Sequence, residues 1–222
     1  MKVPIIMQYD TDEDCKHVVY SSNATGKSQL YIVPTDLSSK AKQITSGMDP
    51  IIGCSLSPKG NLIVYPRDKD GNEIPNLMII PAEGGEAKQI TIEAYRTMGV
   101  AWHPNGKELS RTVITPKGCG IEIIKIDTEE CFTFKAPTPI LLDAHYSHNG
   151  KWIACTAITS FTNTQVYIMN RDDPEDIIIY NITDKSREGL PSWSPDDKKI
   201  AFATEATGRG RIAIKIFREM KD

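Results

Sequence analysis

A short segment of strand, tight turn and second strand recurs along the chain at a nearly constant spacing. The four clear copies begin at Leu56, Trp102, Tyr146 and Trp193. Their turn residues are Gly60, Gly106, Gly150 and Asp197, which lie 46, 44 and 47 residues apart, and a weaker copy places Cys15 45 residues before the first. In each copy the turn is followed by apolar residues at alternate positions, as in a half-buried strand. A period of about 45 residues predicts an array of similar β-sheets, which is typical of a β-propeller.

Each repeat divides into four strand-like pieces, which favours an all-β fold of four-stranded antiparallel blades. In the second repeat these pieces are Ile51–Leu56, Leu62–Arg67, Leu77–Ala82 and Ala87–Thr91. The pentapeptide Ala-Lys-Gln-Ile-Thr occurs at 41–45 and again at 87–91, in phase with the turn. We therefore expect a single β-propeller domain over residues 1–222, with five blades at about 4–45, 50–91, 97–136, 140–183 and 188–222.

Two repeats depart from this pattern. In the third, Arg111 occupies a position that is apolar in the second, fourth and fifth repeats, so this blade is expected to pack differently near its second strand. The fifth has sequence for only three strands, which predicts a thin last blade. Two alternatives follow, because an open array exposes sheet faces and edges. The chain forms a small five-bladed ring, or it is part of a larger ring that further residues or self-association complete.

Composition and charge argue against several classes of partner. The formal net charge is −3 and no run of Lys or Arg exceeds two residues, so a nucleic-acid partner is not expected. The longest apolar runs, such as Ile177–Tyr180, are too short to cross a bilayer, so no membrane association is expected either. Residues 1–8 lack the apolar core of a secretion signal, which predicts a cytoplasmic location.

Several motifs that resemble cofactor or metal sites are better explained by turns. Thr25-Gly26-Lys27-Ser28 lacks the earlier glycine of a phosphate-binding loop and precedes a predicted strand. Asp10, Asp12 and Asp14 lack the glycine and glutamate of a calcium loop, so a solvated acidic turn is expected. The five cysteines contain no Cys-x-x-Cys pair and are interpreted as reduced structural thiols. We expect no cofactor and no metal.

Polar residues in the loops that enter each inner strand are candidate binding residues, because propellers present such loops around one mouth of a channel. They are Asp49, Tyr95, Arg96, Asp143 and Arg187. His145 lies on an inner strand, and strand alternation predicts that it faces the channel on the same side as Asp143. Such a pair could serve acid–base chemistry, but no Ser or Cys nucleophile is evident nearby. A binding role is favoured, and no catalytic residue is assigned.

Two parts of the repeat, the segment 193–202 and the run Gly-Gly-Glu-Ala-Lys-Gln-Ile-Thr at 84–91, resemble the propeller repeat of the TolB family. That repeat is shared with the N-terminal propellers of prolyl oligopeptidase family serine peptidases. The resemblance covers nearly the whole chain and implies a propeller. It does not imply one activity, because the repeat occurs in binding scaffolds, peptidase gates and carbohydrate-active enzymes alike.

Three functions remain open from the sequence. The favoured one is a non-enzymatic propeller scaffold that binds a protein or peptide at the channel mouth. The second is the propeller portion of a prolyl oligopeptidase-like serine peptidase, although no Gly-x-Ser-x-Gly elbow occurs in this chain. The third is a carbohydrate or small-molecule enzyme that uses the channel, with His145 as its base.

Overall fold

The computed structural model describes residues 3–68, 74–91 and 95–217. The chain forms two compact units, Met1–Arg96 and Thr97–Asp222, and each is described by itself. Every regular element in the described ranges is a β-strand. No helix there is long and apolar enough to cross a membrane.

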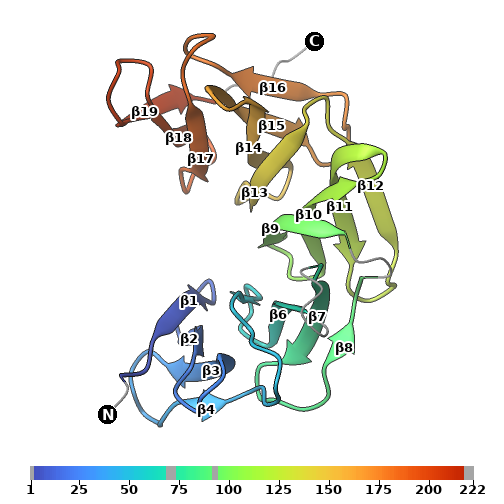
Figure 1. The fold of residues 1–222 in the computed structure, drawn as a ribbon, viewed down its shortest axis with the longest axis vertical. Coiled ribbons are helices and arrows are strands. Elements are labelled where there is room, and N and C mark those ends of the chain that lie inside the picture. Colours follow the sequence, from blue (N-terminus) through green and yellow to red (C-terminus); the bar gives the residue numbers. More distant parts are fainter. Residues whose placement is uncertain (1–2, 69–73, 92–94, 218–222) are drawn as a thin grey trace. The chain divides into compact units, whose positions relative to one another are not determined.

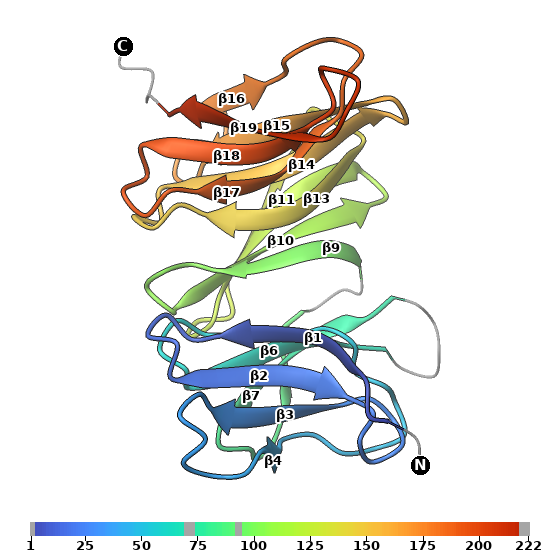
Figure 2. The ribbon, with the colours of Figure 1, turned by 90° about the vertical axis from the view of Figure 1, so that its left-hand side faces the viewer.

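The first unit contains two four-stranded antiparallel sheets, blades 1 and 2, whose strands follow one another in chain order (Figure 1). Blade 1 consists of β1 (Ile6–Thr11), β2 (His17–Ser22), β3 (Gln29–Pro34) and β4 (Lys42–Gln43). Blade 2 consists of β5 (Ser55–Leu56), β6 (Leu62–Arg67), β7 (Asn76–Pro81) and β8 (Lys88–Gln89). Figure 2 shows blade 1 as a meander in which β2 and β3 lie between β1 and β4.

The second unit contains two four-stranded sheets and one three-stranded sheet. Blade 3 consists of β9 (Arg96–Trp102), β10 (Glu108–Thr115), β11 (Gly118–Lys125) and β12 (Cys131–Lys135). Blade 4 consists of β13 (Ile140–Tyr146), β14 (Trp152–Ser160), β15 (Asn163–Asn170) and β16 (Ile177–Tyr180). Blade 5 consists of β17 (Glu188–Trp193), β18 (Lys199–Thr204) and β19 (Arg211–Ile216). The predicted all-β fold of antiparallel blades with a thin last blade is confirmed.

One turn geometry joins the first two strands of all five blades. Its last residue is left-handed, with φ between 53° and 76°; these residues are Cys15, Gly60, Gly106, Gly150 and Asp197. The amide of each donates to the carbonyl three residues earlier, at 2.8–3.0 Å. The weaker first copy therefore has the same turn as the others, with Cys15 in the predicted place. Glycine serves best there because it has no Cβ to oppose a positive φ.

The inner strand of blade 2 is shorter than predicted. A strand was expected over Ile51–Leu56, but β5 contains only Ser55 and Leu56. Its register pairs Ser55 with Val64, which places Gly53 opposite Pro66. Proline has no amide hydrogen to donate, so the ladder ends before it reaches Gly53 and Pro66.

Apolar side chains fill the layers between neighbouring blades within each unit. Leu56 and Tyr65 of blade 2 pack with Val19 and Leu30 of blade 1. In the second unit, Trp193 packs in a cluster with Trp152 of blade 4. Trp193 also meets the Phe217 ring edge-on, at a centroid distance of 4.8 Å. Trp193, the aromatic residue before the turn of blade 5, is thus packed between blades and is only 8% exposed.

Blade 3 differs at its second strand as the sequence predicts. Arg111 is 1% exposed, and its Nε donates to the carboxylate of Glu122, its partner on β11. Its Nη1 also donates to Thr97 Oγ1, at 3.2 Å. The apolar residue of the other blades is thus replaced by a buried ion pair, which needs such hydrogen bonds to offset the loss of hydration.

Candidate functional site

Two inner strands of the second unit carry a bulge with a left-handed residue that is not glycine. In β13 the register shifts between Leu142 and His145, and Asp143 has φ 57°. In β17 the register shifts between Gly189 and Ser192, and Leu190 has φ 54°. Left-handed backbone costs a residue with a Cβ about 1–2 kcal/mol. Strain of this kind concentrates at functional sites, which makes the two bulges the first candidates.

Thr156, on β14, connects the two bulges. Its Oγ1 accepts a hydrogen bond from the amide of Leu190 at 2.9 Å and donates to Oδ2 of Asp143 at 3.3 Å. Two glycines allow the close packing around them. A Cβ on Gly189 would lie 2.8 Å from Cγ2 of Thr156, and a Cβ on Gly99 of β9 would lie 2.5 Å from Cα of Asp143. The bulges are therefore held in place by their neighbours.

We call this region the bulge surface and define it by Asp143, His145, Thr156, Leu190 and Ser192. The side chains of His145, Leu190 and Ser192 are exposed, whereas Thr156 is buried beneath them. The position of His145 is fixed through its backbone, because its carbonyl accepts a hydrogen bond from Nε1 of Trp193 at 3.1 Å. The buried tryptophan thus ties β13 to β17.

The electrostatics of His145 favour a neutral ring. Desolvation by the surrounding protein lowers the pKa of His145 below 6.5, and the negative charge of Asp143 acts in the opposite direction. At neutral pH the ring therefore offers one hydrogen-bond donor and one acceptor. In the described part of the chain no hydroxyl or thiol is hydrogen-bonded to this ring, and no group of three His, Cys, Asp or Glu side chains could hold a metal ion.

The structure brings together only some of the residues that the sequence singled out. Asp143 and His145 lie on the bulge surface. Arg187 lies just before β17, but its guanidinium makes a bidentate ion pair with Glu205, at 2.8 and 3.1 Å. The other three candidate residues lie in the first unit; they are Asp49, Tyr95 and Arg96. There, Oδ2 of Asp49 is 3.4 Å from the Arg67 guanidinium.

Sequence reasoning missed Thr156 and Leu190. Neither residue type suggests a bulge, and Thr156 lies on a strand that alternation places in the core. The nearest signal was Gly189, because glycine inside a strand often marks a bulge or a close approach of two backbones.

Turning to the first unit, the expectation of a solvated acidic turn is wrong for Asp12, which is 5% exposed. Its Oδ1 accepts from the amides of Lys16 and His17, at 2.6 and 3.2 Å, and its Oδ2 lies 2.8 Å from Nδ1 of His17. Burial alone would raise the pKa of Asp12, but these hydrogen bonds outweigh it and lower the pKa below 3.8. The carboxylate therefore organises the turn between β1 and β2 through its hydrogen bonds to Lys16 and His17.

No family model matches the chain. Among curated proteins, the uncharacterized peptidase YuxL of Bacillus subtilis (strain 168) is 26% identical over 153 residues, which cover 68% of this chain and 21% of that protein. Among solved structures, TolB from Acinetobacter baumannii superposes with a TM-score of 0.74 at 22% identity, covering 96% of this chain and 52% of TolB. The fold is a TolB-like β-propeller. A structure from a study of two prolyl endopeptidases gives the same TM-score at 14% identity, covering 95% of this chain and 34% of that one.

These similarities show a fold shared by TolB and by the propeller of prolyl endopeptidases. The TolB-like chain spans about a fifth of the length of the Bacillus subtilis protein and about half of the length of TolB. At such low identity, a common fold says little about a common ligand.

Proposed function

We propose that this TolB-like propeller is a non-enzymatic scaffold that binds a protein or peptide segment at the bulge surface. The observation that carries the proposal is the presentation of Leu190. Its side chain is 69% exposed, although the backbone beneath it is left-handed and strained. Burial of the side chain does not offset that strain, and strained backbone of this kind is concentrated at functional sites, so we place the contact with the partner at this residue.

The polar groups around Leu190 suit an extended peptide. His145 supplies a donor and an acceptor, Ser192 supplies a hydroxyl, and Asp143 supplies a carboxylate, and these residues lie on the contacting inner strands β13 and β17. An apolar anchor surrounded by a few hydrogen-bonding groups is the usual pattern of a recognition site. The rigid strands below hold these groups in place, which limits the entropy lost on binding.

The test is selection of binders from a displayed library of random peptides, followed by affinity measurements on variants. Leu190→Asp is expected to weaken a selected peptide at least tenfold, since removing a central apolar anchor costs about 2 kcal/mol or more. Ile214→Asp is the matched control, because Ile214 is 65% exposed in the same unit but lies on β19. Equal losses in both variants, or no loss in either, would overturn the proposal.

A second function is favoured by one specific observation, the match to a Bacillus subtilis protein named as a peptidase. In this alternative the propeller is part of a prolyl oligopeptidase-like serine peptidase and controls access to a hydrolase domain. Reading the coding sequence on both sides of this segment tests it directly. A downstream hydrolase domain with a Gly-x-Ser-x-Gly elbow would support it, and a stop codon or an unrelated domain there would exclude it.

A further inference from the structure

Within each unit, the front of one blade is covered by the back of the next. The front of a blade is the face turned toward the blade that follows it in the sequence, and the back is the opposite face. The front residues on the third strands are Leu30 and Ile32 in blade 1, Ile121 and Ile123 in blade 3, and Val166 and Ile168 in blade 4. In the three apolar clusters they pack with residues of blades 2, 4 and 5, respectively. This blade-to-blade contact is what the fold repeats.

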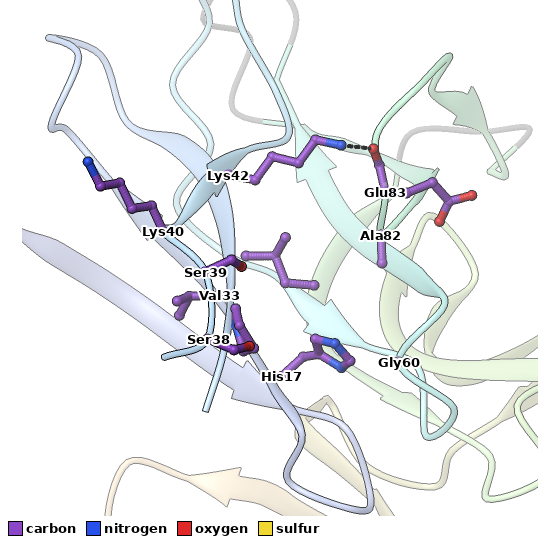
Figure 3. Close-up of a pocket in the computed structure, with 11 residues that line it drawn as sticks. His17, Val33, Ser38, Ser39, Lys40, Lys42, Gly60, Ala82 and Glu83 are labelled. Atoms are coloured by element: carbon purple, nitrogen blue, oxygen red, sulfur yellow. Dashed lines mark hydrogen bonds between the residues drawn. The ribbon is translucent and has the colours of Figure 1, made fainter. Parts of the chain in front are cut away.

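The contact between blades 1 and 2 shows how such an interface is composed. Its middle is apolar, with Leu30 in the same cluster as Ile63 and Tyr65. Beside this cluster, Nζ of Lys42 on β4 donates to the carbonyl of Glu83 in blade 2, at 2.5 Å (Figure 3). An apolar middle with a polar rim is also the usual composition of an interface between two protein chains.

Blade 5 has the same kind of apolar front, but there it is exposed. In register, Ile212 and Ile214 correspond to Val166 and Ile168 of blade 4, because Ile168 and Ile214 each pair with an alanine four residues after the turn residue. Val166 and Ile168 are fully buried, whereas Ile212 and Ile214 are 78% and 65% exposed. An apolar face of the kind that blades 1, 3 and 4 bury is therefore open in blade 5.

Blade 1 has a back that matches this front. The residues three and five places after the turn residue are Ile200 and Phe202 in blade 5, and both pack against blade 4. The same places in blade 1 hold Val18 and Tyr20, which are partly exposed. Tyr9, which pairs with Tyr20, is 70% exposed. Blade 2 also has a tyrosine five places after its turn residue, and that tyrosine is buried in the cluster shared with blade 1.

From this correspondence we infer that two copies of the chain associate head to tail, with the front of blade 5 in one copy on the back of blade 1 in the other. The contact reproduces the interface between blades 4 and 5. On the front, two isoleucines stand for a valine and an isoleucine; on the back, a valine and a tyrosine stand for an isoleucine and a phenylalanine. Exchanges of this kind change the apolar volume little, so the packing is preserved.

A second copy is the occupant that fits, because one chain carries both halves of the contact. Along β19, Ile212, Ile214 and Ile216 form an exposed apolar stripe, which is typical of an interaction site. Two copies joined in this way still have one free front and one free back, so they close into a ring or add further copies. The contact uses β18 and β19, whereas the bulge surface lies on β13, β14 and β17, so the inference does not depend on the proposed peptide site.

Sedimentation equilibrium of the full chain, over about 1–500 µM, tests the inference. We expect the mass to rise from that of one chain to at least that of two, with a Kd in the micromolar range. Ile212→Asp alters the front and Tyr9→Asp alters the back; each should weaken association at least about tenfold, because it places a carboxylate in an apolar contact. Phe161→Asp and Leu37→Asp are the controls, at positions 100% and 74% exposed in a hairpin and in the β3–β4 loop, and should associate like the wild type.

Mixing the two weakened variants shows whether the contact is head to tail. Ile212→Asp keeps an intact back and Tyr9→Asp keeps an intact front, so an equal mixture should form pairs limited to two chains at concentrations where each variant alone is monomeric. Because Ile214 also lies on the front of blade 5, Ile214→Asp should weaken association while leaving the affinity for a peptide at the bulge surface unchanged. A wild-type mass of one chain up to about 500 µM, a mixture that does not pair, or equal effects in the controls would overturn the inference.

Discussion

Replacing Gly60 by alanine tests how the blades are held together at their turns. Gly60 has φ +70°, and a Cβ there would lie 2.6 Å from Oδ2 of the buried Asp12. Gly208, in the β18–β19 hairpin, has φ +77° and no atom within 4 Å of the same Cβ. The two positions therefore share the backbone penalty and differ only in the contact with a neighbouring blade.

The magnitudes follow from these two terms. A left-handed alanine costs about 1–2 kcal/mol, of which about 0.4–1 kcal/mol is recovered through the lower entropy of the unfolded chain. Gly208→Ala is thus expected to lower the free energy of unfolding by about 1 kcal/mol. Gly60→Ala also disturbs hydrogen bonds to an ionised, buried carboxylate, each worth about 1.5–3 kcal/mol. We expect a total cost of about 3 kcal/mol.

The assay is urea unfolding followed by far-ultraviolet circular dichroism, with the free energy taken from linear extrapolation. A double-mutant cycle isolates the contact. In an Asp12→Ala background only the Cβ of residue 12, 3.3 Å away, faces the new methyl group, so the cost of Gly60→Ala should fall to within about 0.5 kcal/mol of that of Gly208→Ala. Equal costs for the two glycine variants in the wild-type background, within about 0.5 kcal/mol, would refute the reasoning.

Three further predictions concern ionisable groups. Arg111→Met should destabilise the protein by about 3–5 kcal/mol because it leaves Glu122 buried without its partner, and Arg111→Met/Glu122→Leu should recover much of that loss in urea unfolding. The pKa of Asp12 is lowered on folding, so its ionised carboxylate stabilises the folded protein fully at pH values above its unfolded pKa of 3.8. This stabilisation is lost as the pH falls through the pKa of the folded state. Asp12→Asn should therefore flatten the acid limb of a stability–pH curve. Desolvation, together with the negative charge of Glu122, raises the pKa of Cys131 to about 12, so a thiol reagent at neutral pH should modify the exposed Cys15 well before the exposed Cys131. Equal rates for these two thiols would contradict that prediction.

The repeat was predictable because the same local sequence pattern specifies the first hairpin of each blade. A turn that ends in a left-handed residue, followed by apolar residues at alternate positions, specifies a hairpin without long-range information. The same reasoning marked Arg111 as an exception. The prediction of one domain over 1–222 stays a prediction, as do the binding roles of Asp49, Tyr95, Arg96, Asp143, His145 and Arg187.

The bulge surface and the burial of Asp12 depend on contacts between blades, which the sequence pattern does not encode. The burial of Asp12 results from the turn of blade 2, and nothing near Asp12 in the sequence indicates it. Leu190 reads as an ordinary strand residue, because its left-handed backbone is imposed by a bulge and a hydrogen bond to Thr156, 34 residues away. Strained positions of this kind are where local rules are expected to fail.

The central claim is that the bulge surface is the place where this propeller meets a protein segment. Photo-crosslinking tests it most directly, with a photoreactive leucine analogue placed at position 190 and, in a second protein, at position 214. The account predicts that a selected peptide crosslinks at 190 and not at 214. Crosslinking at 214 with none at 190 would contradict it.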